Sequence, residues 1–298
     1  MSTTTDKPVI VITGASSGFG KGVALRFAGQ GASLVVAARR VGLLEELARE
    51  CEAMGAVSLP VEADVSQQAD VERVAQTAIS TFGRIDVWIN NAGVAAIGRF
   101  EDVPLGDHVQ VIGTDLMGTM FGSFVALQQF RRQQHGTLIN VASALGKFPV
   151  PYYASYTAAK HGVVGFSAAL RQEIRQNHDD QIHVCTVLPM AMDTPFFQHA
   201  SNYTGREAVP VPPLNDPTLV IDAIVRLANT PEDEVLVGWG GHFTNFAHSL
   251  FPGLTEDAIA KRTHQSQIEQ AHEAEMTLGA VHAPISAGTD VSGGLRKN

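Results

Sequence analysis

The chain has 298 residues, of which 45% are apolar and 17% are charged. This composition is typical of a folded protein with a large interior, and the length suffices to bury a core without disulfides or metals as staples. With 30 acidic and 21 basic residues the formal net charge is −9, which leaves no electrostatic footprint for nucleic acid or an anionic membrane.

Cysteine content and the chain start bear on the compartment. The two cysteines, Cys51 and Cys185, lie far apart in helical or apolar contexts, so we expect buried structural thiols. Residues 1–7 are polar and precede a strand-like run at once, which indicates a flexible N-terminus that is neither a signal peptide nor an anchor. The longest uncharged apolar stretch, 116–130, falls short of the roughly 18–20 residues of a membrane span. We therefore expect a cytoplasmic protein.

Short apolar, β-branched runs alternate along the chain with longer amphipathic runs. Most short runs are continuously apolar, which fits strands covered on both faces. The predicted strands are residues 8–12, 33–37, 56–60, 86–89, 136–141, 181–187 and 234–237. The predicted helices are residues 18–29, 42–54, 67–82, 108–134, 153–177 and 216–229. This alternation predicts a single α/β domain over residues 8–240, with a Rossmann-like, doubly wound parallel sheet of about seven strands and helices on both faces.

Residues 241–298 depart from the alternation and form a C-terminal extension. The stretch 250-LFPGLTEDAIAKR-262 predicts a turn and then a helix capped by Thr255. We expect the extension to be helical to about residue 277, with a thin apolar face that lies on the body or on a partner subunit. From residue 283 on, the chain is rich in Gly, Ser and Pro, which indicates disorder.

The first strand leads into a glycine-rich turn, 13-TGASSGFG-20, which opens the first helix. Ligands of open parallel sheets bind at the carboxyl ends of strands, and a helix N-terminus offers free N–H groups and partial positive charge to a pyrophosphate. The spacing Gly14-x3-Gly18-x-Gly20 differs from the G-x-G-x-x-G of standard dinucleotide domains. Its place between strand and helix favours dinucleotide binding over the alternative, a tight connection without a ligand.

The end of the second strand indicates which dinucleotide binds. When the ribose 2′-hydroxyl is free, an acidic residue is expected about 20 residues after the glycines, but here Arg39 and Arg40 follow the strand. A guanidinium can bind a 2′-phosphate bidentately, so NADP(H) is favoured over NAD(H). The alternative is that these arginines form a solvated helix start. Asp64, after the third strand, is either an adenine contact or an acidic turn residue.

A catalytic pattern lies in the second half of the chain. Tyr156 and Lys160 are four residues apart on a predicted helix, so both lie on one face. A nearby ammonium lowers a tyrosine pKa toward neutrality, which allows the phenol to act as general acid or base. Ser143, just past the fifth predicted strand, could hydrogen-bond a substrate carbonyl.

These motifs together resemble the short-chain dehydrogenase/reductase superfamily over residues 8–240. The resemblance rests on 13-TGASSGFG-20, Asp64, 90-NNAG-93, Ser143, 156-YTAAK-160 and 189-PMAMDT-194, in this order. It implies an NADP(H)-dependent oxidoreductase in which Tyr156 is the acid/base, Lys160 binds the nicotinamide ribose and Ser143 orients the substrate oxygen. It also implies that Thr194 reaches the carboxamide.

The resemblance implies a cofactor site that includes the 90-NNAG-93 turn, which would also steady the central strands. The implied cofactor-binding residues are Gly14, Ser16, Ser17, Gly18, Phe19, Gly20, Arg39, Arg40, Asp64, Val65, Asn91, Ala92, Gly93, Tyr156, Lys160, Pro189, Met190, Met192 and Thr194. Members of the family form dimers or tetramers through two long helices, here 108–134 and 153–177. They need no metal, and the eleven histidines show no metal-ligand spacing.

Two residues depart from the family pattern. Asp115, in 115-DLMG-118, stands where the family has a fourth catalytic residue, an Asn that helps to hold a water in a proton relay. The added charge beside Lys160 should raise the pKa of Tyr156 relative to an Asn-bearing relative. Met190 stands where the family has Gly, and it either favours an apolar substrate or fills a gap.

The stretch 195-PFFQHASNYTGREAVPVPP-213 corresponds to the mobile lid of the family. Its aromatic residues suit a lipophilic carbonyl or alcohol, and Phe148 and Tyr152 either line the same pocket or pack elsewhere. Two alternatives stay open: a cofactor-binding sensor or scaffold that has lost turnover through Asp115, and a lyase or epimerase on the same fold. The intact serine, tyrosine and lysine favour the oxidoreductase. The sequence does not name the substrate.

Overall fold

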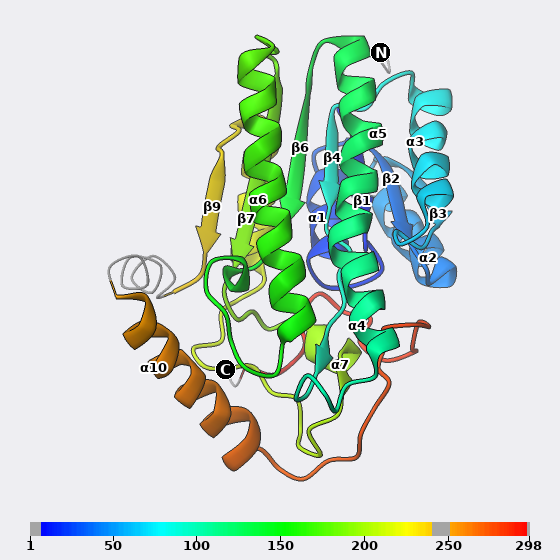
Figure 1. Cartoon of the computed structure of the whole chain (residues 1–298). Helices are drawn as coiled ribbons and strands as arrows, with labels where there is room; N and C mark the ends of the chain where they lie inside the picture. Colours follow the sequence, from blue (N-terminus) through cyan, green and yellow to red (C-terminus); the bar gives the residue numbers. More distant parts are fainter. Residues whose placement is uncertain (1–6, 240–250, 297–298) are drawn as a thin grey trace.

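Seven parallel strands form the central sheet of the computed structural model, which describes residues 7–239 and 251–296 (Figure 1). The strand order is β3-β2-β1-β4-β6-β7-β9. The strands are β1 (Val9–Thr13), β2 (Ser33–Ala38), β3 (Val57–Glu62), β4 (Val87–Asn90), β6 (Gly136–Val141), β7 (Ile182–Pro189) and β9 (Glu234–Val237). The predicted fold class is confirmed, and all seven predicted strands lie within two residues of their observed bounds. A separate small sheet pairs β5 (Ala96–Ile97) with β8 (Ser201–Asn202).

Helices cover both faces of the sheet. They are α1 (Gly18–Ala28), α2 (Val41–Ala53), α3 (Gln68–Phe82), α4 (Leu105–Ile112), α5 (Gly118–Gln133), α6 (Ala154–Gln176), α7 (Phe196–His199), α8 (Thr218–Asn229) and α10 (Pro252–His264). The single helix predicted over 108–134 is observed as α4 and α5 joined by a π-helical turn, Gly113–Met117. Figure 1 shows α5 and α6 crossing in front of the sheet.

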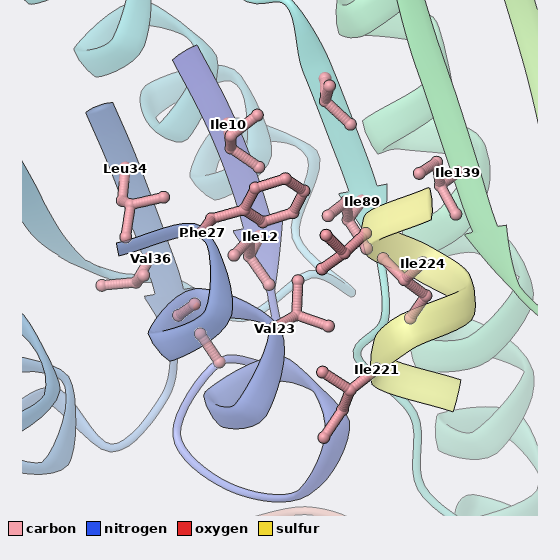
Figure 2. Packing of buried hydrophobic residues seen from close by; sticks show 14 of the residues in the cluster. Ile10, Ile12, Val23, Phe27, Leu34, Val36, Ile89, Ile139, Ile221 and Ile224 are labelled. Carbon is pink, nitrogen blue, oxygen red and sulfur yellow. The ribbon is translucent and has the colours of Figure 1, made fainter. Parts of the chain in front are cut away.

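The core lies in two layers because successive side chains of a strand point to opposite faces. Ile10 and Ile12 of β1 pack with α1 and α8 (Figure 2), whereas Val11, between them, packs with α3 and α5 on the other face. Both cysteines are buried, as predicted, and burial raises the pKa of each thiol to about 11. A thiol with so high a pKa is a weak nucleophile at neutral pH, which supports a structural role.

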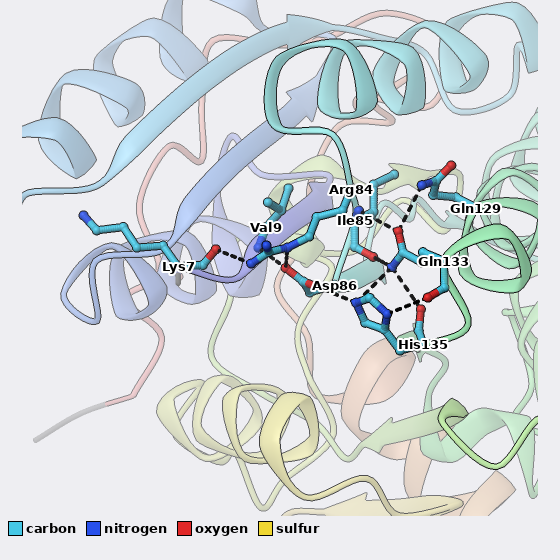
Figure 3. Close-up of polar contacts among 8 residues, drawn as sticks. All are labelled: Lys7, Val9, Arg84, Ile85, Asp86, Gln129, Gln133 and His135. Atoms are coloured by element: carbon cyan, nitrogen blue, oxygen red, sulfur yellow. Dashed lines mark hydrogen bonds and ion pairs between the residues drawn. The ribbon is translucent and has the colours of Figure 1, made fainter. Parts of the chain in front are cut away.

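Polar contacts close the edge of the sheet where the strands begin (Figure 3). The Asp86 carboxylate accepts hydrogen bonds from the Val9 amide at 2.7 Å and from Arg84 Nε at 2.9 Å, and it lies 3.1 Å from His135 Nε2. Gln133 donates to Ile85 O at 2.6 Å from the end of α5. These contacts join the starts of β1, β4 and β6, so the opposite edge of the sheet is left for a ligand.

Within the described ranges, one helical run, Leu105–Gln133, is long and apolar enough to be a candidate membrane span, with a mean hydropathy of 1.2. Its second half, α5, packs against β4, β6 and α3. We therefore interpret the run as a helix of the domain core.

The C-terminal extension differs from its prediction. The helix α10 begins at Pro252 and Thr255 lies inside it, donating its hydroxyl to Phe251 O at 2.9 Å rather than capping the helix. Helical structure ends at Glu269 with a π-helical turn and does not reach residue 277. Residues 283–296 are not disordered but lie along the domain, because their backbone carbonyl and amide groups find polar partners there. The flexible N-terminus predicted over residues 1–7 falls almost wholly outside the described residues.

A glycine of α5 lets this helix approach the sheet closely. A Cβ at Gly122 would collide with Asn90 Oδ1 and lie 2.7 Å from Trp88 Nε1. Trp88 Nε1 donates a hydrogen bond of 2.7 Å to Asn90 Oδ1, so the Cβ would disturb this bond. Gly122→Ala should therefore lower the free energy of unfolding by about 1–3 kcal/mol, as overpacking of a core does. Urea denaturation measures this loss of stability. Gly165→Ala in α6, where a Cβ meets nothing within 4 Å, is the matched control and should not destabilise the protein; equal losses in both variants would contradict the packing argument.

Candidate active site

A cavity of about 680 Å³ opens at the carboxyl ends of the strands. It lies where the chain order reverses, between β1 and β4, the place at which open α/β sheets bind ligands. The volume is within the range of roughly 300–1,000 Å³ typical of small-molecule sites. The glycine-rich turn after β1, the ends of β2 and β3, and the loops after β4, β6 and β7 all line it.

The structure brings nearly all the predicted site residues to this one cavity. Every predicted cofactor-binding residue lines it except Gly20, and so does Ser143. Gly20 instead serves packing, since a Cβ there would collide with Gly14 O and lie 2.7 Å from Asn91 Nδ2. Asp115 is buried behind the cavity wall rather than in it.

The loop after β4 holds the glycine-rich turn in place. Asn91 Nδ2 donates to Thr13 O at 3.0 Å and to Gly14 O at 3.1 Å, and a Cβ at Gly14, whose φ is +67°, would lie 2.7 Å from Ala92 Cα. Asn90 Nδ2 donates to Asn140 Oδ1 at 2.9 Å, which joins β4 to β6. The 90-NNAG-93 turn thus ties the central strands and the first turn together.

The basic end of the cavity lies beside β2. Arg40 donates to the hydroxyl oxygens of Ser16 at 3.1 Å and Ser17 at 2.8 Å, so the guanidinium sits against the glycine-rich turn rather than in solvent. Arg39 and Arg40 also donate to carbonyl oxygens of the C-terminal residues. Asp64 accepts hydrogen bonds from the amide and hydroxyl of Ser66 at 2.9 and 2.8 Å, so it is a turn residue that also lines the cavity.

Ser143, Tyr156 and Lys160 converge at the other end. Tyr156 and Lys160 lie one turn apart on α6, and Lys160 Nζ is 5.4 Å from the centre of the Tyr156 ring. A hydrogen bond from the Ser143 side chain acts on the Tyr156 phenol. The Ser143 hydroxyl oxygen accepts from the Leu145 amide at 3.1 Å, which fixes the side chain at the start of a 3₁₀ turn and leaves its O–H to be donated.

Asp115 reaches Lys160 because of the π-helical turn between α4 and α5. Such a turn inserts one residue into a helix and turns side chains that regular α geometry would point elsewhere. Asp115 Oδ2 lies 3.0 Å from Lys160 Nζ, and its Oδ1 accepts from the Val94 amide at 2.8 Å. Lys160 Nζ also donates to Val141 O at 3.2 Å, so the ammonium is held between β6 and the π turn.

Burial and charge set the pKa values here. Burial raises the pKa of Tyr156, the Lys160 ammonium lowers it, and the Asp115 carboxylate raises it again, with a net rise. We expected Lys160 to bring the pKa of Tyr156 toward neutrality. In the protein without a dinucleotide the pKa is raised instead, because burial and Asp115 together outweigh the ammonium. Burial lowers the pKa of Lys160, but Asp115 and Tyr156 together more than compensate, so the net shift is upward and the lysine stays charged.

Removing the charge of Asp115 should lower the pKa of Tyr156. Asp115→Asn deletes a contribution that raises this pKa while keeping the size of the side chain. We expect the pH profile of kcat/KM to move to lower pH. Asp222→Asn, at an exposed ion pair with Arg26, is the control and should leave the profile in place. An unmoved profile in Asp115→Asn would show that this carboxylate does not act on the tyrosine.

The substrate end of the cavity is apolar. Phe148, Phe196 and Phe197 line it, while Met190 both lines it and packs against the core of α1 and α8. Two residues of the prediction lie outside: Tyr203 donates to Asp107 at 2.8 Å, and the Tyr152 hydroxyl lies 2.5 Å from His264 Nδ1.

Several lining residues were not predicted from the sequence, among them Tyr153, Thr263 and Gln267. Tyr153 directly precedes α6 and lies three residues before Tyr156, a spacing in the predicted helix 153–177 that could have found it. Thr263 and Gln267 come from the C-terminal extension, and Gln267 Nε2 donates to the Tyr153 hydroxyl at 2.6 Å. No sequence pattern marks either of these two. The extension therefore forms part of the cavity wall.

In the part of the chain that the structure describes, no group of three or more His, Cys, Asp or Glu side chains could hold a metal ion. His161 is exposed, and its Nδ1 lies 2.9 Å from Thr157 O of its own helix turn, an oxygen that accepts when Nδ1 carries the proton.

Fold and cavity together define an α/β protein of the dinucleotide-binding class. Comparison with known proteins narrows this class, because residues 8–204 match the family model described as short chain dehydrogenase. The chain belongs to the short-chain dehydrogenase/reductase family and is an oxidoreductase of that family.

Relatives and solved structures agree with the family. The uncharacterized oxidoreductase YxnA of Bacillus subtilis is 35% identical over 87% of this chain and 73% of that protein. The 11-beta-hydroxysteroid dehydrogenase-like 4A of Arabidopsis thaliana is 36% identical over 56% of each chain. A Burkholderia phymatum short-chain dehydrogenase/reductase solved with NAD gives a TM-score of 0.76 at 26% identity, covering 84% of this chain and 96% of that one. A Thermococcus sibiricus alcohol dehydrogenase complexed with 5-hydroxy-NADP gives 0.67 at 26% identity, covering 78% and 96%.

Proposed function

We propose that the protein transfers hydride between NADP(H) and the carbonyl or alcohol group of a lipophilic small molecule, with Tyr156 as the acid/base. One observation carries the proposal: Ser143, Tyr156 and Lys160 line the same cavity as the glycine-rich turn. A rival in which the cavity only senses a dinucleotide would not need a phenol and an ammonium together at its far end.

The residues of the cavity fit a nicotinamide dinucleotide. Arg39, Arg40 and the start of α1 supply cationic and N–H donors for phosphates at one end. Lys160 lies at the other end, where it could bind the ribose next to the nicotinamide. The bound nicotinamide would supply the hydride donor or acceptor.

The chain's own groups would manage the proton. In the reducing direction the Tyr156 hydroxyl would donate its proton to the substrate oxygen, and in the oxidising direction the phenolate would accept it. The Ser143 hydroxyl, which lies beside the Tyr156 phenol, would hydrogen-bond the same substrate oxygen. Lys160 would stabilise the phenolate, and Asp115 would keep Lys160 protonated.

The apolar walls favour a lipophilic substrate. Phe148, Phe196 and Phe197 line the substrate end, and the cavity lining as a whole is more apolar than polar, although Arg262, Thr263 and Gln267 also contribute to it. The Arabidopsis relative named for a hydroxysteroid dehydrogenase supports this class of substrate.

A panel of aldehydes, ketones and quinones, with NADPH oxidation followed by fluorescence, tests the proposal. Turnover of an apolar carbonyl is expected. Dinucleotide binding without oxidation across a broad panel, together with no effect of Tyr156→Phe, would favour the sensor or scaffold instead.

Cofactor preference has its own prediction. NADPH should bind at least tenfold more tightly than NADH, because only NADPH carries the phosphate that the guanidinium groups can bind. Arg39→Ala should remove much of this difference by weakening NADPH binding alone, which fluorescence titration measures. Tighter binding of NADH to the unaltered protein would reject the assignment of Arg39.

We further infer a cytoplasmic homodimer or homotetramer built through α5 and α6. Phe124 of α5 is 55% exposed and Met117, at the end of the π turn, is 37% exposed, which leaves apolar surface for a partner helix. Phe124→Glu should be monomeric, and light scattering tests this expectation. The negative net charge of the chain gives no support for a nucleic-acid partner.

A further inference from the structure

The last residues of the chain lie across the phosphate end of the cavity. We call residues 280–296 the strap; Figure 1 shows its red trace passing the carboxyl ends of the strands. Arg39 donates to Val281 O at 3.2 Å and also to Ala280 O. Arg40 Nη1 donates to the strap at Ala287 O, 3.1 Å away, and at Gly288 O, 3.3 Å away. The two guanidinium groups that should receive a 2′-phosphate therefore already bind backbone carbonyls.

The strap also accepts a hydrogen bond from a backbone amide at the start of α1. Gly18 N donates to Asp290 O at 2.9 Å. This amide belongs to the helix N-terminus that would face the pyrophosphate. Since the strap occupies donors at both predicted phosphate positions, it and the dinucleotide cannot use these donors at the same time.

Both ends of the strap are fastened to the domain. At one end Val281 is fully buried and His282 Nε2 lies 2.8 Å from Asp107 Oδ1. At the other end the Asp193 carboxylate accepts from Ser292 Oγ at 2.9 Å and from the Leu295 amide at 2.9 Å. The middle, which crosses the phosphate donors, is held mainly by its carbonyl groups.

We propose that the strap is an autoinhibitory segment that competes with the phosphates of the dinucleotide for Arg39, Arg40 and the start of α1. The proposal rests on the proposed NADP(H) site. A phosphate offers the guanidinium groups a full negative charge and bidentate acceptor geometry, which the neutral carbonyl oxygens of the strap lack, so the cofactor can displace the strap's middle. The apparent affinity for NADPH then equals the intrinsic affinity multiplied by the fraction of molecules whose strap is open.

A substitution at a glycine of the strap can displace the strap while all the phosphate donors, Arg39, Arg40 and the start of α1, are kept. A Cβ at Gly288, whose φ is +67°, would collide with His199 Nε2 and lie 2.8 Å from Pro195 Cβ. Gly288→Ala should therefore shift the strap toward its open state in the full-length chain. Gly253→Ala in α10, where a Cβ meets nothing within 4 Å, is the matched control. Removal of residues 284–298 provides a second variant that keeps the buried Val281.

The test is stopped-flow and equilibrium binding of NADPH to these proteins, with hydrogen exchange of the strap measured with and without NADPH. We expect Gly288→Ala and the shortened chain to bind NADPH at least tenfold more tightly, with a faster association rate, while Gly253→Ala matches the unaltered protein. NADPH should speed exchange of the strap amides in the unaltered protein.

Several outcomes would overturn the proposal. Unchanged or weaker binding by both strap variants, or slower strap exchange with NADPH, would show that the strap does not compete and would leave the NADP(H) site intact. Absence of NADPH binding by every variant would reject the site itself and the strap's role with it. If the shortened chain does not fold, Gly288→Ala decides.

Discussion

Tyr156→Phe should lower kcat by about a hundred- to ten-thousandfold, the contribution of a well-placed general acid or base. The substitution removes only the phenol oxygen, and the ring keeps its contact with Phe196 at 5.3 Å between centroids. Binding of NADPH should remain within about threefold, because the phosphate donors lie at the other end of the cavity. Steady-state kinetics and fluorescence titration measure the two effects separately.

Tyr152→Phe is the matched control for this prediction. Tyr152 lies four residues earlier, but its hydroxyl faces His264 of α10 and not the cavity. Its loss should change kcat little. If both variants lost activity equally, the effect would be one of folding or of the C-terminal extension, and the acid/base role of Tyr156 would be contradicted.

The sheet could be predicted from the sequence because most of its strands are short, mainly apolar and β-branched runs. A strand such as β2 is buried on both faces and is apolar in every residue but Ser33, so the apolar run in the sequence marks the strand. The glycine-rich turn could be predicted from its place between a strand and a helix. The Tyr156–Lys160 pair could be predicted because spacing along one helix determines which side chains share a face.

Other parts of the site leave no such pattern. The π turn at Gly113–Met117 inserts one residue into an otherwise regular helix, and neither proline nor a change of period marks it. The strap binds Arg39 and Arg40 through backbone carbonyl groups, which every residue has, so this binding leaves no pattern in the sequence. Its Gly- and Ser-rich composition therefore indicated disorder. Gln267 and Thr263 enter the cavity wall only through the docking of the C-terminal extension.

Lys160→Met should lower the free energy of unfolding by about 3–5 kcal/mol, as expected when one partner of a buried ion pair is removed. Lys160 is 5% exposed and Asp115 is fully buried, so the remaining carboxylate would have neither water nor a cation. Lys147→Met breaks an ion pair of similar length, 2.8 Å to Glu234, but both of its side chains are more than a quarter exposed. It should cost less than about 1 kcal/mol, the value typical of surface pairs. Urea denaturation of both variants measures the difference.

The loss in Lys160→Met should also depend on pH, which separates an electrostatic cause from lost packing. Burial raises the pKa of Asp115, and Lys160 is the cation that opposes this rise, so the substitution raises the pKa further. A carboxyl whose folded pKa exceeds its unfolded value stabilises the protein at low pH, and this stability is lost as pH rises through the folded pKa. The deficit of Lys160→Met should therefore be small near pH 5 and grow toward neutral pH. Adding Asp115→Asn removes the stranded charge and should restore most of the stability at neutral pH; a deficit that is independent of pH and unaffected by the second substitution would instead mean that the methylene stem of Lys160, and not its charge, holds the site together.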